Sequence, residues 1–232
     1  MALNQSSAVS VAVAMDADSH PEVAKPIAPE LDVFEVTEQY LRDFVKAEVP
    51  RLIRRRSRAM LVEEMEVCLG RARVDLAVIA DRLIGIEIKG PRDDVTRLPG
   101  QVLAYSRCFD RVILVVDEAL AKKALPLVPD WWGIVIGGRC EGAFVPRFER
   151  RPRPNPQLDM DALLSLLWRE EINSLTRDLL GIVTKPRATK RALRSELCER
   201  LDVDVLRQAS LDKLRARSDW RSTPVHQVPC MA

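Results

Sequence analysis

Short apolar runs separated by helical stretches constrain the fold of this chain more than any other feature. Residues 111–116 are almost uninterrupted apolar residues, and the runs at 74–80 and 83–89 are apolar apart from a few charged positions. A continuous apolar strand is buried on both faces of its sheet, so helices must cover both sides. A chain of 232 residues is long enough to bury such a sheet. We therefore expect an α/β core.

Helical periodicity recurs between these strand-like runs. In the stretch that follows the third strand, Pro99 and Gly100 indicate a kink or a late helix start. The predicted order is a helix over 34–50, strands over 60–67, 74–80 and 83–89, a helix over 93–109, a strand over 111–116, a helix over 118–127 and a strand over 132–136. Three consecutive strands closed by a helix and a further strand predict a mixed sheet flanked by helices.

The prolines between residues 146 and 156 indicate a boundary after this core. Three further helices are predicted over 158–180, 189–201 and 203–217, and Thr189 and Asp202 are suitable N-caps for the last two. The predicted organisation is a flexible tail over 1–30, the core over 31–150, a small helical C-terminal appendage over 157–217 and a second flexible tail over 218–232.

Histidine and cysteine usage exclude several classes of chemistry. The two histidines, His20 and His226, both lie in the predicted tails, which argues against Ser-His-Asp triads and zinc sites built on paired histidines. The five cysteines are scattered and form no Cys-x-x-Cys pair, so neither a zinc ribbon nor a disulfide framework is indicated, and Cys68 and Cys108 are expected to be small core residues. No run approaches membrane-spanning length. These features favour a protein of the reducing cytoplasm.

Two carboxylates interrupt the apolar strands. Asp75 lies in the run at 74–80, and Glu87 and Lys89 lie in the run at 83–89. An unpaired buried carboxylate is costly, so these positions require an explanation. Strand alternation places Asp75 on the opposite face from Val74 and Leu76. A two-residue turn would put Asp75 and Glu87 on different faces, whereas a three-residue loop over 80–82 would place them directly opposite each other.

Paired carboxylates repel each other unless a cation lies between them. A hard divalent ion such as Mg²⁺ or Mn²⁺ is the natural occupant of an oxygen site. A lysine two residues after the second carboxylate can position or deprotonate a water molecule beside the metal. Metal, water and lysine together suit hydrolysis of a phosphodiester. An internally paired, purely structural cluster remains the alternative if Asp75 and Glu87 occupy different faces.

The pattern of Asp75 followed by Glu87-Ile88-Lys89 resembles the PD-(D/E)xK nuclease superfamily. Gln101 and Tyr105 on the following helix are similar to the Q-x-x-x-Y motif of its RecB-like branch. More closely, residues 85–116 and 128–133 resemble a family of uncharacterised bacterial and phage-associated proteins placed in that superfamily. The resemblance spans roughly residues 34–221 and implies a restriction-endonuclease-like fold.

The resemblance also implies roles for individual residues. Asp75, Glu87 and the backbone carbonyl of Ile88 would bind the metal, and Lys89 would orient or activate the attacking water. Gln101 and Tyr105, four residues apart and hence on one helical face, would shape the site and contact the substrate phosphate. The upstream acidic ligand is ambiguous among the acidic residues of the preceding helix and strand. Glu64 is favoured because it lies on the strand just before the motif.

A second group of cations could contact nucleic acid. The basic residues around the start of the helix at 189–201 are Lys185, Arg187, Lys190 and Arg191, and a helix N-terminus also favours anions. The sequence thus predicts a metal-dependent nuclease that hydrolyses DNA, with repair, phage replication and defence all left open. The alternative is a catalytically silent module on the same fold that binds nucleic acid or protein. Protein partners are not indicated.

Overall fold

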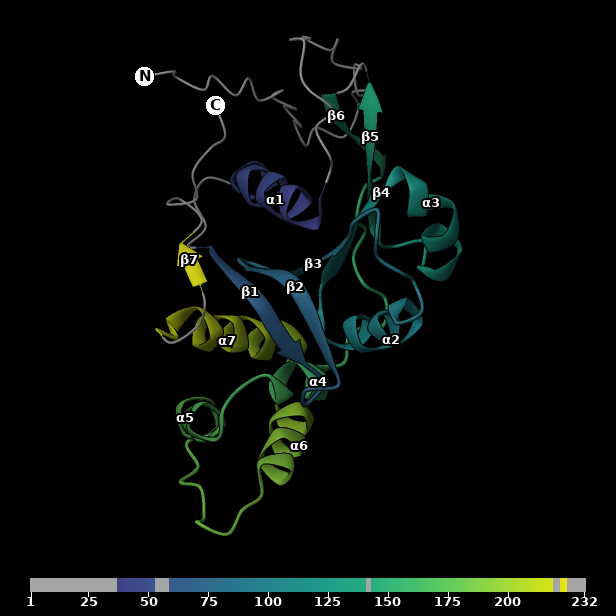
Figure 1. The fold of residues 1–232 in the computed structure, drawn as a ribbon. Helices are drawn as coiled ribbons and strands as arrows, with labels where there is room; N and C mark the ends of the chain where they lie inside the picture. Colours follow the sequence, from purple (N-terminus) through teal and green to yellow (C-terminus); the bar gives the residue numbers. More distant parts are fainter. Residues whose placement is uncertain (1–36, 53–58, 141–142, 219–221, 225–232) are drawn as a thin grey trace, which may run out of the picture.

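The computed structural model describes residues 37–52, 59–140, 143–218 and 222–224, which form a mixed sheet covered by helices on both faces (Figure 1). The sheet has seven strands in the order β6-β5-β4-β3-β2-β1-β7. Pairing is parallel between β3, β4 and β5 and antiparallel elsewhere. The strands are β1 (Met60–Val67), β2 (Ala72–Ile79), β3 (Leu83–Lys89), β4 (Arg111–Asp117), β5 (Gly133–Cys140), β6 (Ala143–Arg150) and β7 (Ser222–Pro224).

Helix α1 covers one face of the sheet, and the other helices lie on the opposite face and beyond its lower end in the view of Figure 1. Leu41 and Val45 of α1 belong to one buried cluster, whereas the helices from α2 onward contribute to the other. The helices are α1 (Glu38–Leu52), α2 (Leu98–Cys108), α3 (Glu118–Ala124), the 3₁₀ turn η1 (Leu125–Leu127), α4 (Met160–Ser165), α5 (Arg169–Leu180), α6 (Lys190–Arg200) and α7 (Val203–Ala216).

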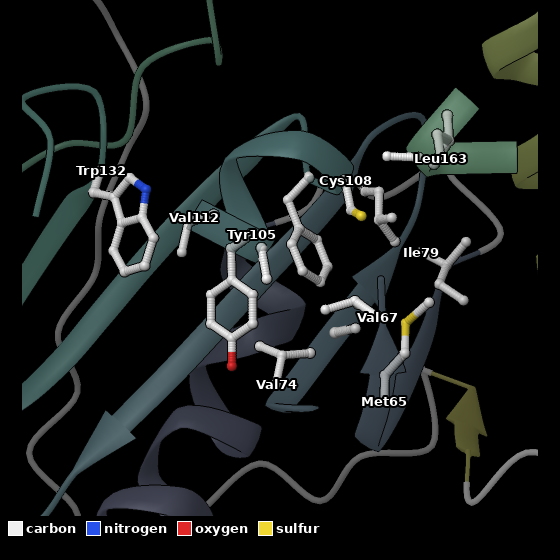
Figure 2. Close-up of a cluster of buried hydrophobic side chains, with 14 of the residues drawn as sticks. Met65, Val67, Val74, Ile79, Tyr105, Cys108, Val112, Trp132 and Leu163 are labelled. Carbon is white, nitrogen blue, oxygen red and sulfur yellow. The ribbon is translucent and has the colours of Figure 1, made fainter. Parts of the chain in front are cut away.

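Strand β4 is the centre of the hydrophobic core, as its apolar run predicts. Leu114 and Val116 pack in the cluster beneath α2, while Ile113 and Val115 pack in the cluster beneath α1. Tyr105 of α2 lies at the heart of the larger cluster, stacked 6.0 Å from Trp132 between ring centroids (Figure 2). The expected mixed sheet flanked by helices is confirmed.

The C-terminal helices differ in detail from their sequence pattern. The stretch expected as one helix over 158–180 is two helices, α4 and α5, separated by Leu166–Trp168. Thr189 and Asp202 are N-caps as predicted, since their side chains accept hydrogen bonds from backbone amides of α6 and α7. Buried leucines of these helices join the same cluster as the sheet, so they share its core.

Two strands lie where none was expected. Strand β6 contains Pro146, one of the prolines interpreted as a boundary; β6 is at the sheet edge, where a residue without an N–H is tolerated. Strand β7 pairs with β1 although it falls in the stretch 218–232 predicted as a flexible tail. The tail predicted over residues 1–30 lies outside the described residues. Pro99 lies in the first turn of α2, which gives the late start indicated by the sequence.

Candidate active site

The loop between β2 and β3 fixes which residues meet across the two strands. Ala77 pairs with Gly85 and Ile79 with Leu83, so the connection comprises the three residues 80–82. This is the odd-length loop that the site hypothesis requires. Continued by two positions beyond Ala77 and Gly85, the same register places Asp75 opposite Glu87.

The carboxylate of Asp75 lies where β2 and β3 stop pairing. The last paired residues are Leu76 and Ile86, and beyond them the Ile88 amide donates a 2.7 Å hydrogen bond to Asp75 Oδ2. The alternation of β2 also changes here, because Val74 packs in the same cluster as Ala77. The expectation that Val74 shares an apolar face with Leu76 is therefore wrong. The local irregularity brings the Asp75 carboxylate into the opening between the strands.

Glu87 is almost completely buried and accepts hydrogen bonds at both carboxylate oxygens. Its Oε1 lies 2.8 Å from Lys89 Nζ and 2.6 Å from Gln101 Nε2. Its Oε2 lies 2.7 Å from the Tyr105 hydroxyl. Four of the residues predicted for the site thus make one hydrogen-bonded cluster, with Glu87 at its centre.

This cluster holds more hydrogen-bond acceptors than donors. The Tyr105 hydroxyl lies 2.7 Å from both Glu87 Oε2 and the Arg73 carbonyl oxygen, yet it has one proton to donate. Gln101 Oε1 is buried and has no hydrogen-bond partner among the described residues. Burial, followed by the nearby Glu87 charge, raises the pKa of Tyr105, so its hydroxyl stays protonated and acts as a donor. The cluster therefore has room for one more donor or cation.

Asp75 has a different electrostatic environment. Burial is the largest cause that raises its pKa to about 7, and repulsion by the Glu87 carboxylate is the second. The Ile88 amide and the cations Arg42 and Lys89 act in the opposite direction but do not cancel the effect. A cation bound beside Asp75 would compete with the proton and keep the group ionised.

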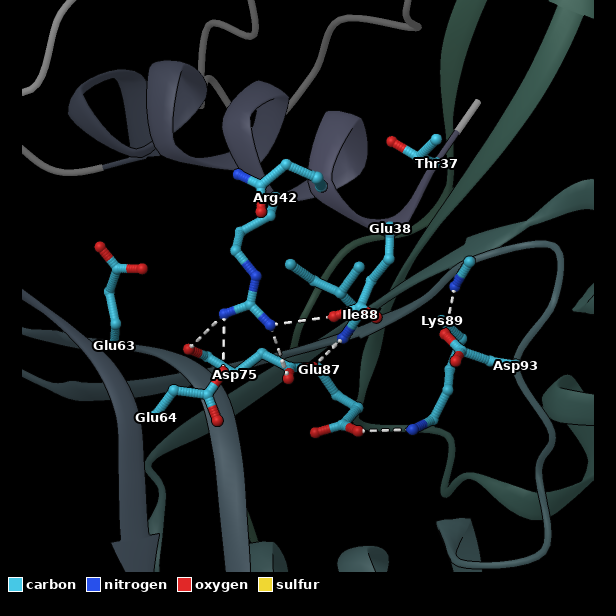
Figure 3. Close-up of polar contacts among 12 residues, drawn as sticks. Thr37, Glu38, Arg42, Glu63, Glu64, Asp75, Glu87, Ile88, Lys89 and Asp93 are labelled. Atoms are coloured by element: carbon cyan, nitrogen blue, oxygen red, sulfur yellow. Dashed lines mark hydrogen bonds and ion pairs between the residues drawn. The ribbon is translucent and has the colours of Figure 1, made fainter. Parts of the chain in front are cut away.

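Arg42 of α1, which the sequence analysis did not single out, pairs with three carboxylates (Figure 3). Its guanidinium nitrogens lie 3.1 Å from Asp75 Oδ1, 2.9 Å from Glu64 Oε1 and 3.0 Å from Glu38 Oε1. Arg42 is mostly buried beneath the neighbouring side chains, and a guanidinium does not lose its proton in proteins. It is thus a permanent cation beside Asp75.

Glu64 of β1 lies opposite Asp75 of β2, whereas Glu87 belongs to β3, the other neighbour of β2. The pairs Glu63 with Leu76 and Met65 with Val74 flank it, and Glu64 itself has a left-handed backbone with φ of 54°. Its second oxygen lies 3.0 Å from Arg73 Nε. Glu64, Asp75 and Glu87 therefore occupy neighbouring positions on three adjacent strands, but arginines already hold both oxygens of Glu64.

These residues line a cleft of about 860 Å³ between β1, β2 and α2. Glu64, Asp75, Glu87, Ile88, Lys89 and Gln101 all contribute to its wall, and Tyr105 lies beneath it in the core. The cations at 185–191 do not line this cleft. They belong to the α5–α6 loop and the start of α6, where Lys190 Nζ donates to the Ser165 carbonyl at 3.1 Å.

The donor set suits a hard divalent cation. It comprises the carboxylates of Asp75 and Glu87, next to the unpaired oxygen of Gln101, and hard cations prefer oxygen ligands. A cation bound here would lower the raised pKa of Asp75. It would also give the unpaired Gln101 oxygen a partner. Within the described residues, no three acidic, histidine or cysteine side chains are already arranged around one metal position.

Comparison with known proteins gives a family match. No curated protein and no solved structure matches the chain. Every helix within the described ranges is too short or too polar to span a membrane. A sequence model for the bacteriophage P4 protein cII matches residues 38–225, which include all strands of the sheet and all the helices from α1 to α7. This confirms the expected similarity to phage-associated proteins, and the chain belongs to the family of the bacteriophage P4 protein cII.

Proposed function

We propose that the chain is a metal-dependent nuclease that hydrolyses DNA phosphodiester bonds with a PD-(D/E)xK-type site. The observation that carries the proposal is the cluster around Glu87. Lys89, Gln101 and Tyr105 bond the same carboxylate, and Asp75 lies opposite it by register. A purely structural ion pair would need neither the unpaired Gln101 oxygen nor an ionisable carboxylate facing the cleft.

Asp75 and Glu87 are the side chains that would hold Mg²⁺ or Mn²⁺, with the Ile88 carbonyl as a further ligand. When bound, such an ion supplies Lewis-acid stabilisation of charge on the phosphoryl oxygens. Lys89 Nζ donates one hydrogen bond to Glu87 Oε1, and its remaining N–H groups can orient a water molecule and a phosphate oxygen. Gln101 and Tyr105 fix Glu87, which keeps its carboxylate in one orientation.

The walls of the cleft also suit a polyanion. Arg71 and Arg73 of the β1–β2 hairpin face the cleft together with Arg97 and Arg107 at α2. All four are exposed at its rim, where guanidinium groups pair well with phosphate. Phosphate contacts by these arginines would position DNA over Asp75 and Glu87, and the cations at 185–191 are a second, more remote candidate surface. The cytoplasm is the compartment in which we propose that this occurs.

The test is cleavage of end-labelled single- and double-stranded DNA by the purified full chain with Mg²⁺, Mn²⁺ or EDTA. We expect metal-dependent cleavage that Glu87→Gln and Lys89→Ala each reduce by roughly 10²–10⁴-fold. Asp81→Asn is the matched control, since Asp81 is an exposed acid in the β2–β3 loop, at the other end of the strands. Cleavage that persists in both site variants would contradict the proposal.

One observation favours the second candidate, a catalytically silent module that binds nucleic acid or protein. Each central carboxylate already has a protein cation, Arg42 for Asp75 and Lys89 for Glu87. A site whose charges are balanced in this way can be stable without metal. DNA binding that needs neither metal nor Glu87, in a chain that cleaves none of the substrates, would favour this second function over the nuclease.

A further inference from the structure

Two cysteines that are forty residues apart in the sequence meet at one end of the cleft. Cys68, the residue that follows β1, and Cys108, the last residue of α2, have their sulfur atoms 3.6 Å apart. Cys108 is fully buried in the core, as Figure 2 shows, whereas Cys68 is partly exposed and lines the cleft. The expectation that both are small core residues is confirmed for Cys108, whereas Cys68 packs against the edge of the core and is only partly buried.

We propose that Cys68 is a site of thiol oxidation and that Cys108 captures the oxidised sulfur to form a Cys68–Cys108 disulfide. The oxidant class is a hydroperoxide, for which hydrogen peroxide is the probe. The inference does not rest on nuclease activity, because it follows from the positions and surroundings of the two thiols.

The surroundings of Cys68 favour its thiolate. The Cys108 thiol lies 3.6 Å away and can donate a hydrogen bond to the ionised Cys68 sulfur, and the Arg107 and Arg71 guanidinium groups lie close enough to stabilise its negative charge. Together they lower the pKa of Cys68 to about 7. The same bond and burial raise the pKa of Cys108, which therefore stays protonated as the second thiol. A partly exposed, low-pKa thiol beside a second cysteine is the arrangement that oxidation selects.

The reaction balances with peroxide alone. The Cys68 thiolate attacks one peroxide oxygen, the S–O bond forms as the O–O bond breaks, and hydroxide leaves and takes up the proton that Cys68 had released. The Cys108 sulfur then attacks the sulfenic sulfur, and the S–S bond forms as the S–O bond breaks, with water leaving with the Cys108 proton. Two thiols lose two electrons, and one peroxide becomes two water molecules.

The hairpin turn allows the sulfurs to approach to bonding distance. A disulfide needs about 2 Å between sulfur atoms, so Cys68 must move toward the fixed Cys108. Cys68, Leu69 and Gly70 all have left-handed backbones, and Leu69 is 75% exposed, so a shift of this turn removes little core packing. The disulfide would tie the β1–β2 turn to the end of α2 and so fix the width of the cleft there.

The experiment treats the full chain with hydrogen peroxide, alkylates the remaining thiols under denaturing conditions and identifies cross-linked peptides by mass spectrometry. We expect a Cys68–Cys108 cross-link in the wild type and in Cys198→Ser, a matched control at a partly exposed thiol of α6. Cys68→Ser should abolish the cross-link. Cys108→Ser should instead leave a sulfenic acid at Cys68 that dimedone traps.

Reactivity supplies a second measurement that does not need the disulfide. In the Cys108→Ser variant at pH 7, where no disulfide can consume the sulfenic acid, we expect dimedone labelling of Cys68 after peroxide to exceed that of Cys198 by roughly five- to tenfold, because burial raises the pKa of Cys198 whereas that of Cys68 is lowered. Equal labelling of Cys68 and Cys198 in Cys108→Ser would overturn the proposal. So would a folded wild-type chain whose cross-links involve Cys140, Cys198 or Cys230 but not the Cys68–Cys108 pair.

Discussion

Asp75 and Glu87 line the same cleft from the neighbouring strands β2 and β3, yet their surroundings differ. Glu87 is 1% exposed and is held by three side chains from its own strand and α2. Asp75 is partly exposed and is held by the Ile88 amide and by Arg42, which comes from α1 on the other face of the sheet. One carboxylate is thus held on the α2 face of the sheet, and the other is bridged to the helix that packs on the opposite face.

The difference indicates how the candidate site is assembled. The donors around Glu87 belong to elements that the hydrophobic core fixes, since Tyr105 is packed between Phe109 and Trp132. The partner of Asp75 depends instead on where α1 lies on the sheet. We therefore expect changes at Glu87 to affect stability most, and changes around Asp75 to affect charge and pH dependence.

The largest expected effect is that of Glu87→Ala. It leaves the Lys89 ammonium, 6% exposed, without its carboxylate and removes the acceptor of Gln101 and Tyr105. Breaking a buried pair in this way costs about 3–5 kcal/mol of the free energy of unfolding, measured by urea denaturation. The double variant Glu87→Leu/Lys89→Met should recover most of that loss, because no buried charge remains. A loss below about 1 kcal/mol in the single variant would show that the pair is not buried as described.

The next effect is a pH dependence from Asp75. Its pKa is about 7 in the folded chain and 3.8 in the unfolded one, so the folded state binds more protons between these values. The free energy of unfolding must therefore fall as the pH rises from about 4 to 7. Asp75→Asn lacks this term and should gain roughly 1–3 kcal/mol relative to the wild type at pH 8, with little difference at pH 4. Denaturation at pH 4, 5.5 and 8 measures it, and a gain that is equal at all three values would refute it.

Much of the arrangement around Glu87 can be predicted from the sequence. The apolar runs predict β2, β3 and β4. Because side chains alternate along a strand, the length of the β2–β3 loop alone then decides whether Asp75 and Glu87 lie on the same face. The spacing of Gln101 and Tyr105 places both on one face of α2, and that face proves to be the one beside Glu87. Local periodicity and pairing were sufficient here because few elements are involved.

The Asp75 half could not be predicted in the same way. Arg42 is 33 residues from Asp75, and nothing in the sequence around it distinguishes it from a solvated helical arginine. The contact between Cys68 and Cys108 likewise depends on how the β1–β2 hairpin packs against α2. Strand β6 was not predicted for another reason. A proline such as Pro146 normally argues against a strand, unless the strand is known to lie at the edge of the sheet.

A smaller effect is expected for Tyr105→Phe. The ring contacts with Phe109 and Trp132 are kept, and only the hydroxyl that serves Glu87 and the Arg73 carbonyl is lost. The expected loss is about 1–2 kcal/mol, because buried acceptors are left with fewer donors. In a double-mutant cycle with Glu87→Gln, the two losses should not add, since the residues share one bond. Full additivity would show that the hydroxyl acts through Arg73 instead.

The smallest effect tests the outer edge of the Arg42 cluster. Glu38 is 48% exposed and lies one turn before Arg42, so their pair is an exposed i,i+4 contact, whereas Asp75 is 18% exposed. Glu38→Ala should cost only about 0.3–0.5 kcal/mol, and 1 M salt should remove that loss because the screening length falls to about 3 Å. Arg42→Gln should cost more and respond less to salt, since it also releases Asp75 and Glu64. Equal losses and equal salt dependence in the two variants would mean that α1 contributes no more to Asp75 than a surface ion pair does.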